Sequence, residues 1–402
     1  MKKIFFLLLS GLPVPAVDGG AIETLLQILI EQNEIYHNFD FKVICVGSEK
    51  AKKESTKYKY TEFVFFKNSK VDFILERFSR CVYRLFRVVL PHSDACFKAL
   101  KYLKKNKDYD ILVNETWKVY LSTLFAKVAP KDKIVTHIHR KGEVSKGDIS
   151  KKIDNNIGYL LSVSDFISND WCTETGRDKN KAFVLKNCCD TYSFKKRLSD
   201  IEKLKLKKKL HIDDDKVVII FVGRITAEKG LKELLMSLNM IRDKDKIHLL
   251  IVGGSLDGSK TVFEKEIDEI VSNHECSISQ IGYVDNSEIY KYYSISDIAV
   301  LPSVCPDAAL LTGIEAMTAG IPVITSNIGG IPEYSSSDAA ILVDVDESFL
   351  NNLASSIQKL VNDEVLRANM KEKSLKRSLR FTPENYYKDF CNIICKILSM
   401  SS

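Results

Sequence analysis

The sequence contains no run of about 18 consecutive apolar residues, which is the length that a helix needs to cross a bilayer. The most apolar stretch, residues 4–9 near the N-terminus, is much too short to span one. We therefore expect a protein that is not integral to a membrane.

The ten cysteines include no CxxC pair and no Cys/His cluster with the spacing of zinc ligands. In a chain of 402 residues, cysteines scattered in this way indicate reduced core thiols in a reducing cytosol. Their even number leaves a disulfide framework as the alternative.

A large excess of charge of either sign is also absent. The formal net charge of +6 fits an anionic ligand or an acidic surface, but it is too small and too dispersed to indicate nucleic-acid binding. The lysine-rich run at 203–209 is typical of the solvated face of a linker helix, and a nucleic-acid or membrane patch is the alternative.

The N-terminal segment "MKKIFFLLLSGLPVPAVDGG" has the lysines, short apolar run and small residues of a secretory signal. The alternative is a buried first strand followed by a glycine-containing turn into a helix. We favour the strand, because cleavage near Ala16 would remove the strand that the helical pattern "VDGGAIETLLQILIEQ" needs before it.

Short apolar runs alternate with helical patterns along the whole chain. Such runs indicate strands buried on both faces, and helices between them imply parallel sheets with right-handed crossovers. Because the pattern restarts after the lysine-rich run, we predict an α/β fold with two doubly wound, Rossmann-like domains at 1–198 and 199–381. Ligands bind such sheets at the carboxyl ends of the strands, so we expect a cleft lined by the loops that follow them. The expected strands are 3–9, 41–47, 62–66, 110–114, 133–139, 158–164 and 182–186, then 216–223, 247–254, 277–284, 297–303, 321–326 and 339–344.

The stretch "FVGRITAEKGLKELL" opens the second series. A buried strand ends at Val222, and Arg224 and Lys229 flank the start of a helix. A guanidinium and an ammonium beside free helix N–H groups form a credible site for a phosphate or diphosphate. Ordinary surface charges after a strand are the alternative.

Residues 297–334 contain two carboxylates in mostly apolar surroundings, and an unpaired buried carboxylate is costly. Asp307 lies in a loop after a strand, and Glu315 lies on a predicted helix. We expect this helix to begin near Ala308, so that the backbone N–H groups of Leu311 and Thr312 point into the cleft. A structural pairing of Glu315 with a nearby base is the alternative.

Histidines alternate with an apolar residue in "IVTHIHRKGE". Because side chains two apart in an extended chain share a side, His137 and His139 should point the same way. A lone histidine is more often structural than functional, so these residues alone leave their role open.

The order and spacing of these elements resemble the family 4 glycosyltransferases of the two-Rossmann-domain (GT-B) type over nearly the whole chain. The family signature is a strand-G-R-x4-K-G element, then about eighty residues later Glu-x7-Glu and "G-x-P-V-[IV]…GG-x-x-E". The matching segments are "FVGRITAEKG", "PDAALLTGIEAM", "GIPVITSNIGGIPE", "GGAIETL", "LSVSDFI", "VLKNCCDTYSF", "GYVDNSEIYKYYSISDIAVLPS" and "FTPENYYKDF". The last resembles a C-terminal helix that crosses back, so we assign 382–402 to the first domain.

The resemblance gives the second domain a nucleotide-sugar site. It implies that Glu315 accepts hydrogen bonds from the ribose hydroxyls and that Asp307 holds hydroxyls of the donor sugar near its reacting carbon. It implies that Arg224, Lys229 and the N–H groups of Leu311 and Thr312 contact the diphosphate.

The same resemblance gives the first domain the acceptor side. Gly19 and Gly20 would let backbone approach the diphosphate or the acceptor closely. His139 aligns best with a family histidine beside the donor sugar, with His137 as the alternative, and Glu333 of "GGIPE" is a cleft residue.

Two departures from the family pattern affect this site. Asp307 is one methylene shorter than the usual glutamate, and Ala309 and Leu310 replace a frequent Phe-Gly. We expect the shorter acid to change which sugar is held, and Leu310 to narrow backbone access to the phosphates.

The resemblance implies transfer with retention of the anomeric configuration, and we expect that no divalent metal is needed. Asp-x-Asp spacings occur at 108–110 and 344–346, but neither has the context of the metal motif in the other large glycosyltransferase fold. Arg224 and Lys229 would stabilise the leaving nucleoside diphosphate. No strong general base stands out, which agrees with a front-face substitution in which the leaving phosphate takes the acceptor proton.

One further segment, 71–90, has the pattern of an interfacial helix. Arg77, Arg80, Arg84 and Arg87 fall on one stripe of a helix, and aromatic and aliphatic residues cover much of the rest. This pattern suits a peripheral membrane contact, and a surface helix packed on its own domain is the alternative.

The sequence therefore predicts a cytoplasmic glycosyltransferase that moves a sugar from a UDP- or GDP-linked donor to a saccharide or lipid-linked acceptor. Cell-surface polysaccharide or lipopolysaccharide assembly is the expected pathway. The alternatives are a sugar-phosphate synthase or epimerase on the same fold, and a non-catalytic scaffold that binds sugar nucleotide or lipid.

Overall fold

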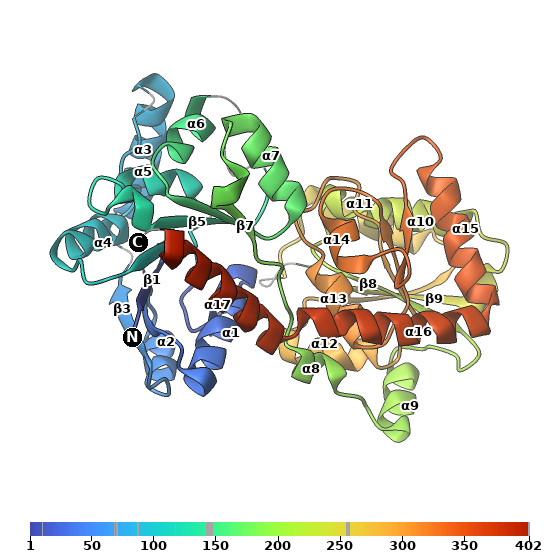
Figure 1. Cartoon of the computed structure of the whole chain (residues 1–402). Helices are drawn as coiled ribbons and strands as arrows, with labels where there is room; N and C mark the ends of the chain where they lie inside the picture. The colour runs from blue at the N-terminus through green and yellow to red at the C-terminus, as the bar shows by residue number, and fades with distance from the viewer. Residues whose placement is uncertain are drawn as a thin grey trace. The chain divides into compact units, whose positions relative to one another are not determined.

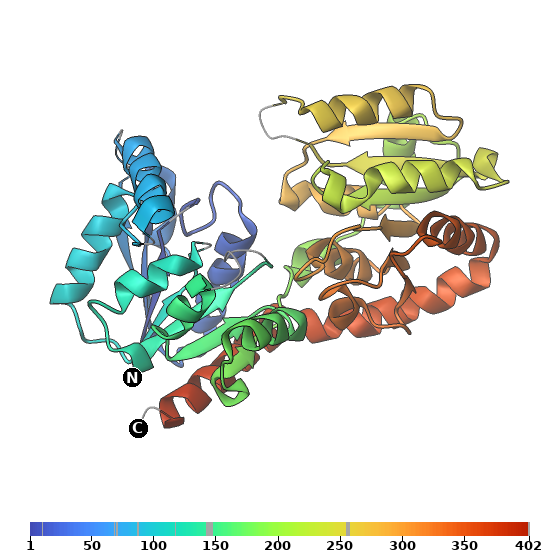
Figure 2. The same cartoon turned by 90° about the horizontal axis from the view of Figure 1, so that it is seen from above.

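The computed structural model describes residues 1–9, 11–67, 69, 71–86, 88–116, 118–141, 148–254 and 258–400 (Figure 1, Figure 2). The chain forms two compact units. Unit 1 is Met1–Asn187 with Pro383–Ser402, and unit 2 is Cys188–Thr382.

The boundary between the units lies at Asn187, before the one predicted at residue 198. The segment in between packs on the second unit, where the Phe194 ring lies 6.0 Å from the Tyr293 ring, centroid to centroid. Cys189 Sγ also lies 3.5 Å from Thr318 Oγ1. These contacts explain the difference, because the lysine-rich helix at 200–209 begins only after the chain has joined the second unit.

Unit 1 contains a seven-stranded sheet of order β3-β2-β1-β4-β5-β6-β7, in which the neighbouring strands are parallel. The N-terminal apolar run forms β1, an interior strand between β2 and β4, which confirms the interpretation as a strand. The strands are β1 Lys3–Leu8, β2 Asp40–Val46, β3 Thr61–Phe66, β4 Ile111–Asn114, β5 Ile134–Ile138, β6 Tyr159–Ser162 and β7 Ala182–Val184.

Unit 2 contains a six-stranded parallel sheet of order β10-β9-β8-β11-β12-β13. The thirteen strand-like runs of the sequence thus correspond to the thirteen strands of the described chain. The strands are β8 Val217–Val222, β9 Ile247–Val252, β10 Ser277–Gly282, β11 Ile298–Leu301, β12 Val323–Ser326 and β13 Ala340–Val343.

Alternate side chains of β8 point to opposite faces of the sheet and are buried on both, which explains why this strand is apolar throughout. Val218 and Ile220 belong to a core cluster on one face of the sheet, whereas Ile219 and Phe221 belong to the cluster on the other face. Helices cover both faces, so neither set of side chains reaches water.

The helices of unit 1 include the C-terminal helix α17 (Pro383–Met400), which returns to it as predicted. Its Phe390 ring packs 5.9 Å from that of Phe6, and the Tyr387 hydroxyl donates to Asn33 Oδ1 at 2.6 Å. The other helices of this unit are α1 Ala21–Tyr36, α2 Glu49–Ser55, α3 Asp72–Phe86, α4 Asp94–Lys105, α5 Ser122–Phe125, α6 Asp148–Asp154 and α7 Asp165–Thr175.

The helices of unit 2 pack on both sides of its sheet (Figure 1). They are α8 Thr191–Lys195, α9 Asp200–Lys209, α10 Leu231–Asn239, α11 Val262–Ser272, α12 Asn286–Tyr293, α13 Leu311–Thr318, α14 Ile331–Ser335, α15 Phe349–Asn362 and α16 Glu364–Ser378. Across the described part of the chain, none of the helices has both the length and the apolar character of a membrane span.

Candidate functional site

Three loops meet at the carboxyl edge of the sheet in unit 2. They follow β8, β11 and β12, which are neighbours in the sheet, and the strand order reverses between β8 and β11. Ligands of open α/β sheets bind at such a reversal. This edge is therefore the candidate site of the second unit.

Backbone contacts fix the three loops against one another. Gly230 has a left-handed φ of 72°, and a Cβ there would lie 1.9 Å from the carbonyl oxygen of Pro302. The amide of Val304 donates to the Glu228 carbonyl at 3.0 Å, and that of Gly330 donates to the Asp307 carbonyl at 2.7 Å. Backbone contacts thus join all three loops.

Arg224 and Lys229 both lie on the loop after β8, as the sequence predicts. The Arg224 side chain is 70% exposed, and its guanidinium pairs with Glu228 at 2.9 Å. The Lys229 ammonium forms an ion pair with the Asp307 carboxylate. The structure therefore brings together two residues that are far apart in the sequence. In the absence of a bound anion, the Asp307 carboxylate neutralises the charge of Lys229.

The helix after Asp307 begins at Leu311 and not near Ala308 as predicted. The backbone is non-helical at Leu310, whose φ and ψ are −107° and 75°, and its side chain is buried in the core. The N–H groups of Leu311 and Thr312 lack an intrahelical partner, as at the start of any α-helix, and no side chain among the described residues caps them. We expected the Leu310 side chain to narrow access to these N–H groups. It does not, because it is only 3% exposed and lies in the core.

Glu315 lies one turn into α13 and is partly buried. The hydroxyl of Tyr293 lies 3.2 Å from Glu315 Oε2 and 3.2 Å from the Thr312 carbonyl oxygen, so its single proton is shared between two acceptors. Burial raises the pKa of Glu315 to about 7, and the Tyr293 hydroxyl opposes that rise. No cationic partner of Glu315 appears in the described residues, so the structural pairing with a base is not observed.

Sequence reasoning missed Tyr293, because an aromatic residue at helical spacing is usually a core residue. It is buried on α12, and proximity to Glu315 adds to burial in raising the pKa of its hydroxyl well above the usual value. Tyr293 therefore stays a hydrogen-bond donor and fixes the position of the Glu315 carboxyl group.

Glu333 lies on α14, in the segment that follows β12. Its backbone carbonyl accepts a hydrogen bond of 2.5 Å from Arg377, which also donates to the Tyr334 carbonyl. Glu333 therefore belongs to the segment that follows β12 at the candidate edge, and its backbone is hydrogen-bonded to Arg377 of α16.

In unit 1, Gly19 and Gly20 join β1 to α1 with left-handed φ values of 79° and 99°. A Cβ at Gly20 would lie 2.1 Å from Oε2 of Glu23, whereas a Cβ at Gly19 would meet no atom within 4 Å. Glu23 accepts a hydrogen bond from the Leu12 amide, and burial raises the pKa of this carboxyl group. Gly20 is thus required by close packing of a buried acid that the sequence did not reveal.

His137 and His139 point to the same side of the chain, as predicted. Their ring centroids lie 4.0 Å apart, and both imidazoles contact the carboxylate of Glu115. His137 Nδ1 lies 3.0 Å and His139 Nε2 lies 2.8 Å from Glu115 Oε2.

Burial and the neighbouring His137 lower the pKa of His139 to about 4. Burial alone would raise the pKa of Glu115, but the two imidazoles hold it well below its usual range. Glu115 was missed because it follows a different strand, although its place directly after "DILVN" is a usable signal.

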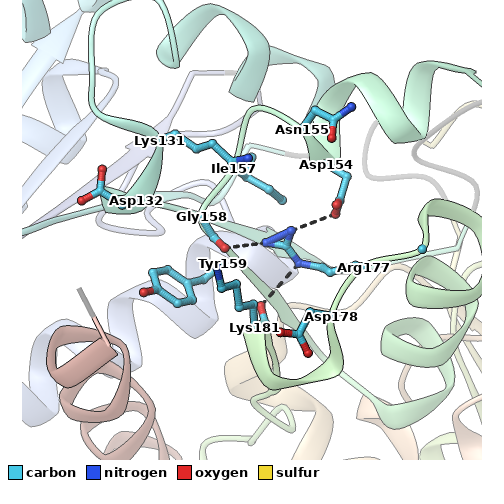
Figure 3. Close-up of a pocket in the computed structure, with 11 residues that line it drawn as sticks. Lys131, Asp132, Asp154, Asn155, Ile157, Gly158, Tyr159, Arg177, Asp178 and Lys181 are labelled. Carbon is cyan, nitrogen blue, oxygen red and sulfur yellow. Dashed lines mark hydrogen bonds and ion pairs between the residues drawn. The ribbon is translucent and has the colours of Figure 1, made fainter. Parts of the chain in front are cut away.

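A hollow of about 530 Å³ lies at the opposite, amino edge of the sheet in unit 1 (Figure 3). Figure 3 shows the Arg177 guanidinium between Asp154 and the Gly158 carbonyl, with N–O distances of 3.0 and 2.7 Å. These contacts already satisfy the charge of the Arg177 guanidinium. We therefore interpret the residues around this hollow as structural contacts between strands and helices.

Residues 202–377 match the family model described as "Glycosyl transferases group 1". The chain is 24% identical over 345 residues to a lipopolysaccharide 1,2-N-acetylglucosaminetransferase of Salmonella typhimurium, covering 83% of this chain and 82% of the relative. It is 28% identical to the capsular polysaccharide biosynthesis glycosyltransferase CapM of Staphylococcus aureus, covering 54% and 56% of the two chains. The chain spans about half the length of several curated relatives that it matches.

Among solved structures, Anabaena Alr3699/HepE in complex with UDP superimposes with a TM-score of 0.74 at 18% identity. The alignment covers 98% of this chain and 100% of the Anabaena chain, and that protein was also solved with UDP-glucose. The comparisons thus support a glycosyltransferase, with the family match in the second unit and the GT-B fold over the whole chain.

Proposed function

We propose that this protein is a retaining glycosyltransferase of family 4 that transfers a sugar from a nucleoside-diphosphate donor to a saccharide or lipid-linked acceptor. The observation that carries this proposal is the convergence of Arg224, Lys229, Asp307, the start of α13 and Glu315 at one sheet edge. The names of the Salmonella and Staphylococcus relatives support a role in cell-surface polysaccharide or lipopolysaccharide assembly.

The donor nucleotide is proposed to bind across α13. The ionised Glu315 would accept hydrogen bonds from the two ribose hydroxyls, since a carboxylate offers two acceptor oxygens at suitable spacing. The N–H groups of Leu311 and Thr312 and the positive end of the helix would face the diphosphate. The UDP complexes of the Anabaena neighbour favour UDP over GDP as the nucleotide.

Lys229 is proposed to exchange Asp307 for the donor diphosphate. Without a donor the Lys229 ammonium pairs with the Asp307 carboxylate. On donor binding, Lys229 and Arg224 would stabilise the charge that develops on the leaving diphosphate. Asp307 would then be released to accept hydroxyls of the donor sugar.

Transfer is proposed to need no divalent metal at the diphosphate, because two cationic side chains and a helix N-terminus supply positive charge there. The leaving phosphate would take the proton of the acceptor hydroxyl, and the new bond would form on the face that the nucleotide leaves. Unit 1 is proposed to bind the acceptor, with Gly19, Gly20 and His139 as its contacts.

Helix α3 is proposed to hold the protein at the cytoplasmic surface of a membrane, where a lipid-linked acceptor would be presented (Figure 1). Ile74, Phe78 and Leu85 share one stripe of the helix and are 65%, 58% and 70% exposed. Exposed Arg77, Arg80 and Arg84 form the adjacent stripe, and Arg87 lies outside the described residues.

Vesicle co-sedimentation tests this membrane contact. Ile74→Ser with Leu85→Ser should abolish binding to phosphatidylglycerol vesicles, because these side chains would enter the interface. Val262→Ser, which removes a side chain that is 87% exposed on unit 2, is the matched control and should leave binding unchanged. Equal sedimentation of both variants would rule out α3 as the contact.

Product analysis tests the reaction itself. The protein should release UDP from one UDP sugar only when a membrane extract supplies the acceptor, and the anomeric configuration of the new bond should match that of the donor. Release that persists in EDTA agrees with transfer without a metal. Inversion at the anomeric carbon would contradict the proposed mechanism.

A further inference from the structure

We infer that Glu115, His137 and His139 form a site for one divalent transition-metal ion of the zinc class. The ion would be held by residues of unit 1, whereas the proposed diphosphate site belongs to unit 2. The inference goes beyond the proposed function, with which it shares His139, a proposed contact of the acceptor.

The fold brings these three side chains together through two neighbouring strands. In the register of β4 with β5, Asn114 pairs with Thr136, so Glu115 and His137 are the next residues on adjacent strands. His139 lies two residues further and shares the side of His137. Two of the three are held by the sheet, because the Glu115 amide donates to the Leu7 carbonyl and His137 pairs with Leu161.

The donor atoms have the spacing of a metal site. His137 Nδ1, His139 Nε2 and a Glu115 carboxylate oxygen all lie within 4.8 Å of one another. The two imidazole nitrogens lie 3.0 and 2.8 Å from Glu115 Oε2. Donor atoms that share one zinc ion are roughly 3 to 4 Å apart, so an ion fits with small side-chain adjustments.

Two imidazole nitrogens and one carboxylate oxygen select the metal class. Mg²⁺ and Ca²⁺ prefer sites made of oxygen atoms, whereas imidazole suits Zn²⁺ and its first-row neighbours. Three protein donors would leave the fourth position of a tetrahedral ion to water.

The three donor side chains form a buried cluster. The side chains of His137, Glu115 and His139 are only 1%, 4% and 8% exposed. Among the described residues, Nε2 of His137 has no hydrogen-bond partner, although a buried polar atom usually has one. A metal bound through His137 Nδ1 would not supply a partner for this Nε2 atom.

Metal retention by the full-length protein tests the inference. After treatment with a chelator, incubation with Zn²⁺ and desalting, elemental analysis should find one Zn²⁺ per chain. Zn²⁺ should also raise the Tm of the wild type. His137→Gln and Glu115→Gln should each weaken Zn²⁺ binding by more than about a hundredfold, since even loss of an outer-shell partner costs ten- to a hundredfold.

The matched control is His248→Gln, which removes another buried histidine, in unit 2, whose ring bonds to Ser277 and Ser279. This variant should keep its Zn²⁺. Because the chain has exposed thiols at Cys81, Cys305 and Cys395, the wild type is also loaded with Co²⁺. Nitrogen and oxygen ligands should give visible d–d bands without a sulfur-to-cobalt charge-transfer band.

The inference is overturned if the wild type retains no more Zn²⁺ than His137→Gln, or if Co²⁺ shows thiolate ligands or no bound spectrum. The Co²⁺ spectrum needs no substitution, so it decides the question even if a variant fails to fold.

Discussion

The affinity for a UDP sugar should depend on pH through Glu315. Burial raises the pKa of this carboxyl group to about 7. Only the ionised form offers two acceptor oxygens to the ribose hydroxyls, so protonation of the free protein competes with binding. Affinity should therefore rise as pH increases through 7 and level off above it.

The size of the effect follows from the ionised fraction. With a pKa near 7, roughly a tenth of the Glu315 side chains are ionised at pH 6 and nine tenths at pH 8. The dissociation constant should fall about tenfold across this interval, or ~1.4 kcal/mol of binding free energy. Tyr293→Phe removes the hydrogen bond that lowers the pKa, so its midpoint should move to higher pH.

Isothermal titration calorimetry with UDP-glucose from pH 6 to pH 8.5 is the assay. A nucleotide sugar is preferable to UDP, because its diphosphate is a diester whose charge does not change in this range. Glu315→Gln should bind more weakly and show a flat profile. A wild-type profile as flat as that of Glu315→Gln would refute the assigned role of the carboxylate.

The same pKa has a consequence for stability without ligand. The folded carboxyl group of Glu315 holds its proton up to about pH 7, whereas the unfolded group loses it near 4.5. Folding stability is therefore lost as pH rises from the lower to the higher value. Glu315→Gln should have the higher Tm at pH 8 and the same Tm as the wild type at pH 4.5.

Three further outcomes are expected. Gly230→Ala should destabilise unit 2 by roughly 2 kcal/mol more than Gly176→Ala does unit 1 in urea unfolding, because both have left-handed φ but only Gly230 meets backbone atoms; equal effects would contradict the loop contact. Asp307→Asn should bind UDP at least as tightly as the wild type by calorimetry, yet lose about a hundredfold or more in turnover; weaker UDP binding would contradict the exchange of partners. Tyr387→Phe should lower stability by about 1 kcal/mol, because it removes the buried hydrogen bond to Asn33; no change in the urea midpoint would contradict it.

The sequence was most informative where burial is complete. The runs at β8 and β9 are apolar throughout because both faces of the sheet are covered, so strand positions and the α/β class could be predicted. Arg224 and Lys229 could be found because they stand directly after such a run, on the side where ligands bind.

Contacts between distant segments were beyond sequence reasoning. Glu115 meets the histidines across two strands, and Tyr293 meets Glu315 across two helices, so neither pair has a local pattern. The start of α13 was predicted three residues early because Ala308 and Leu310 have good helix propensity. Burial of the Leu310 side chain in the core outweighs that local preference.

Thermal stabilisation by UDP, GDP, ADP and CMP tests the proposed donor site most directly. A ligand that binds only the folded protein must raise its Tm. UDP should stabilise the wild type, and Arg224→Ala and Glu315→Ala should each lose this response. No shift with any of the four nucleotides at millimolar concentration would contradict the diphosphate site and favour a non-catalytic scaffold.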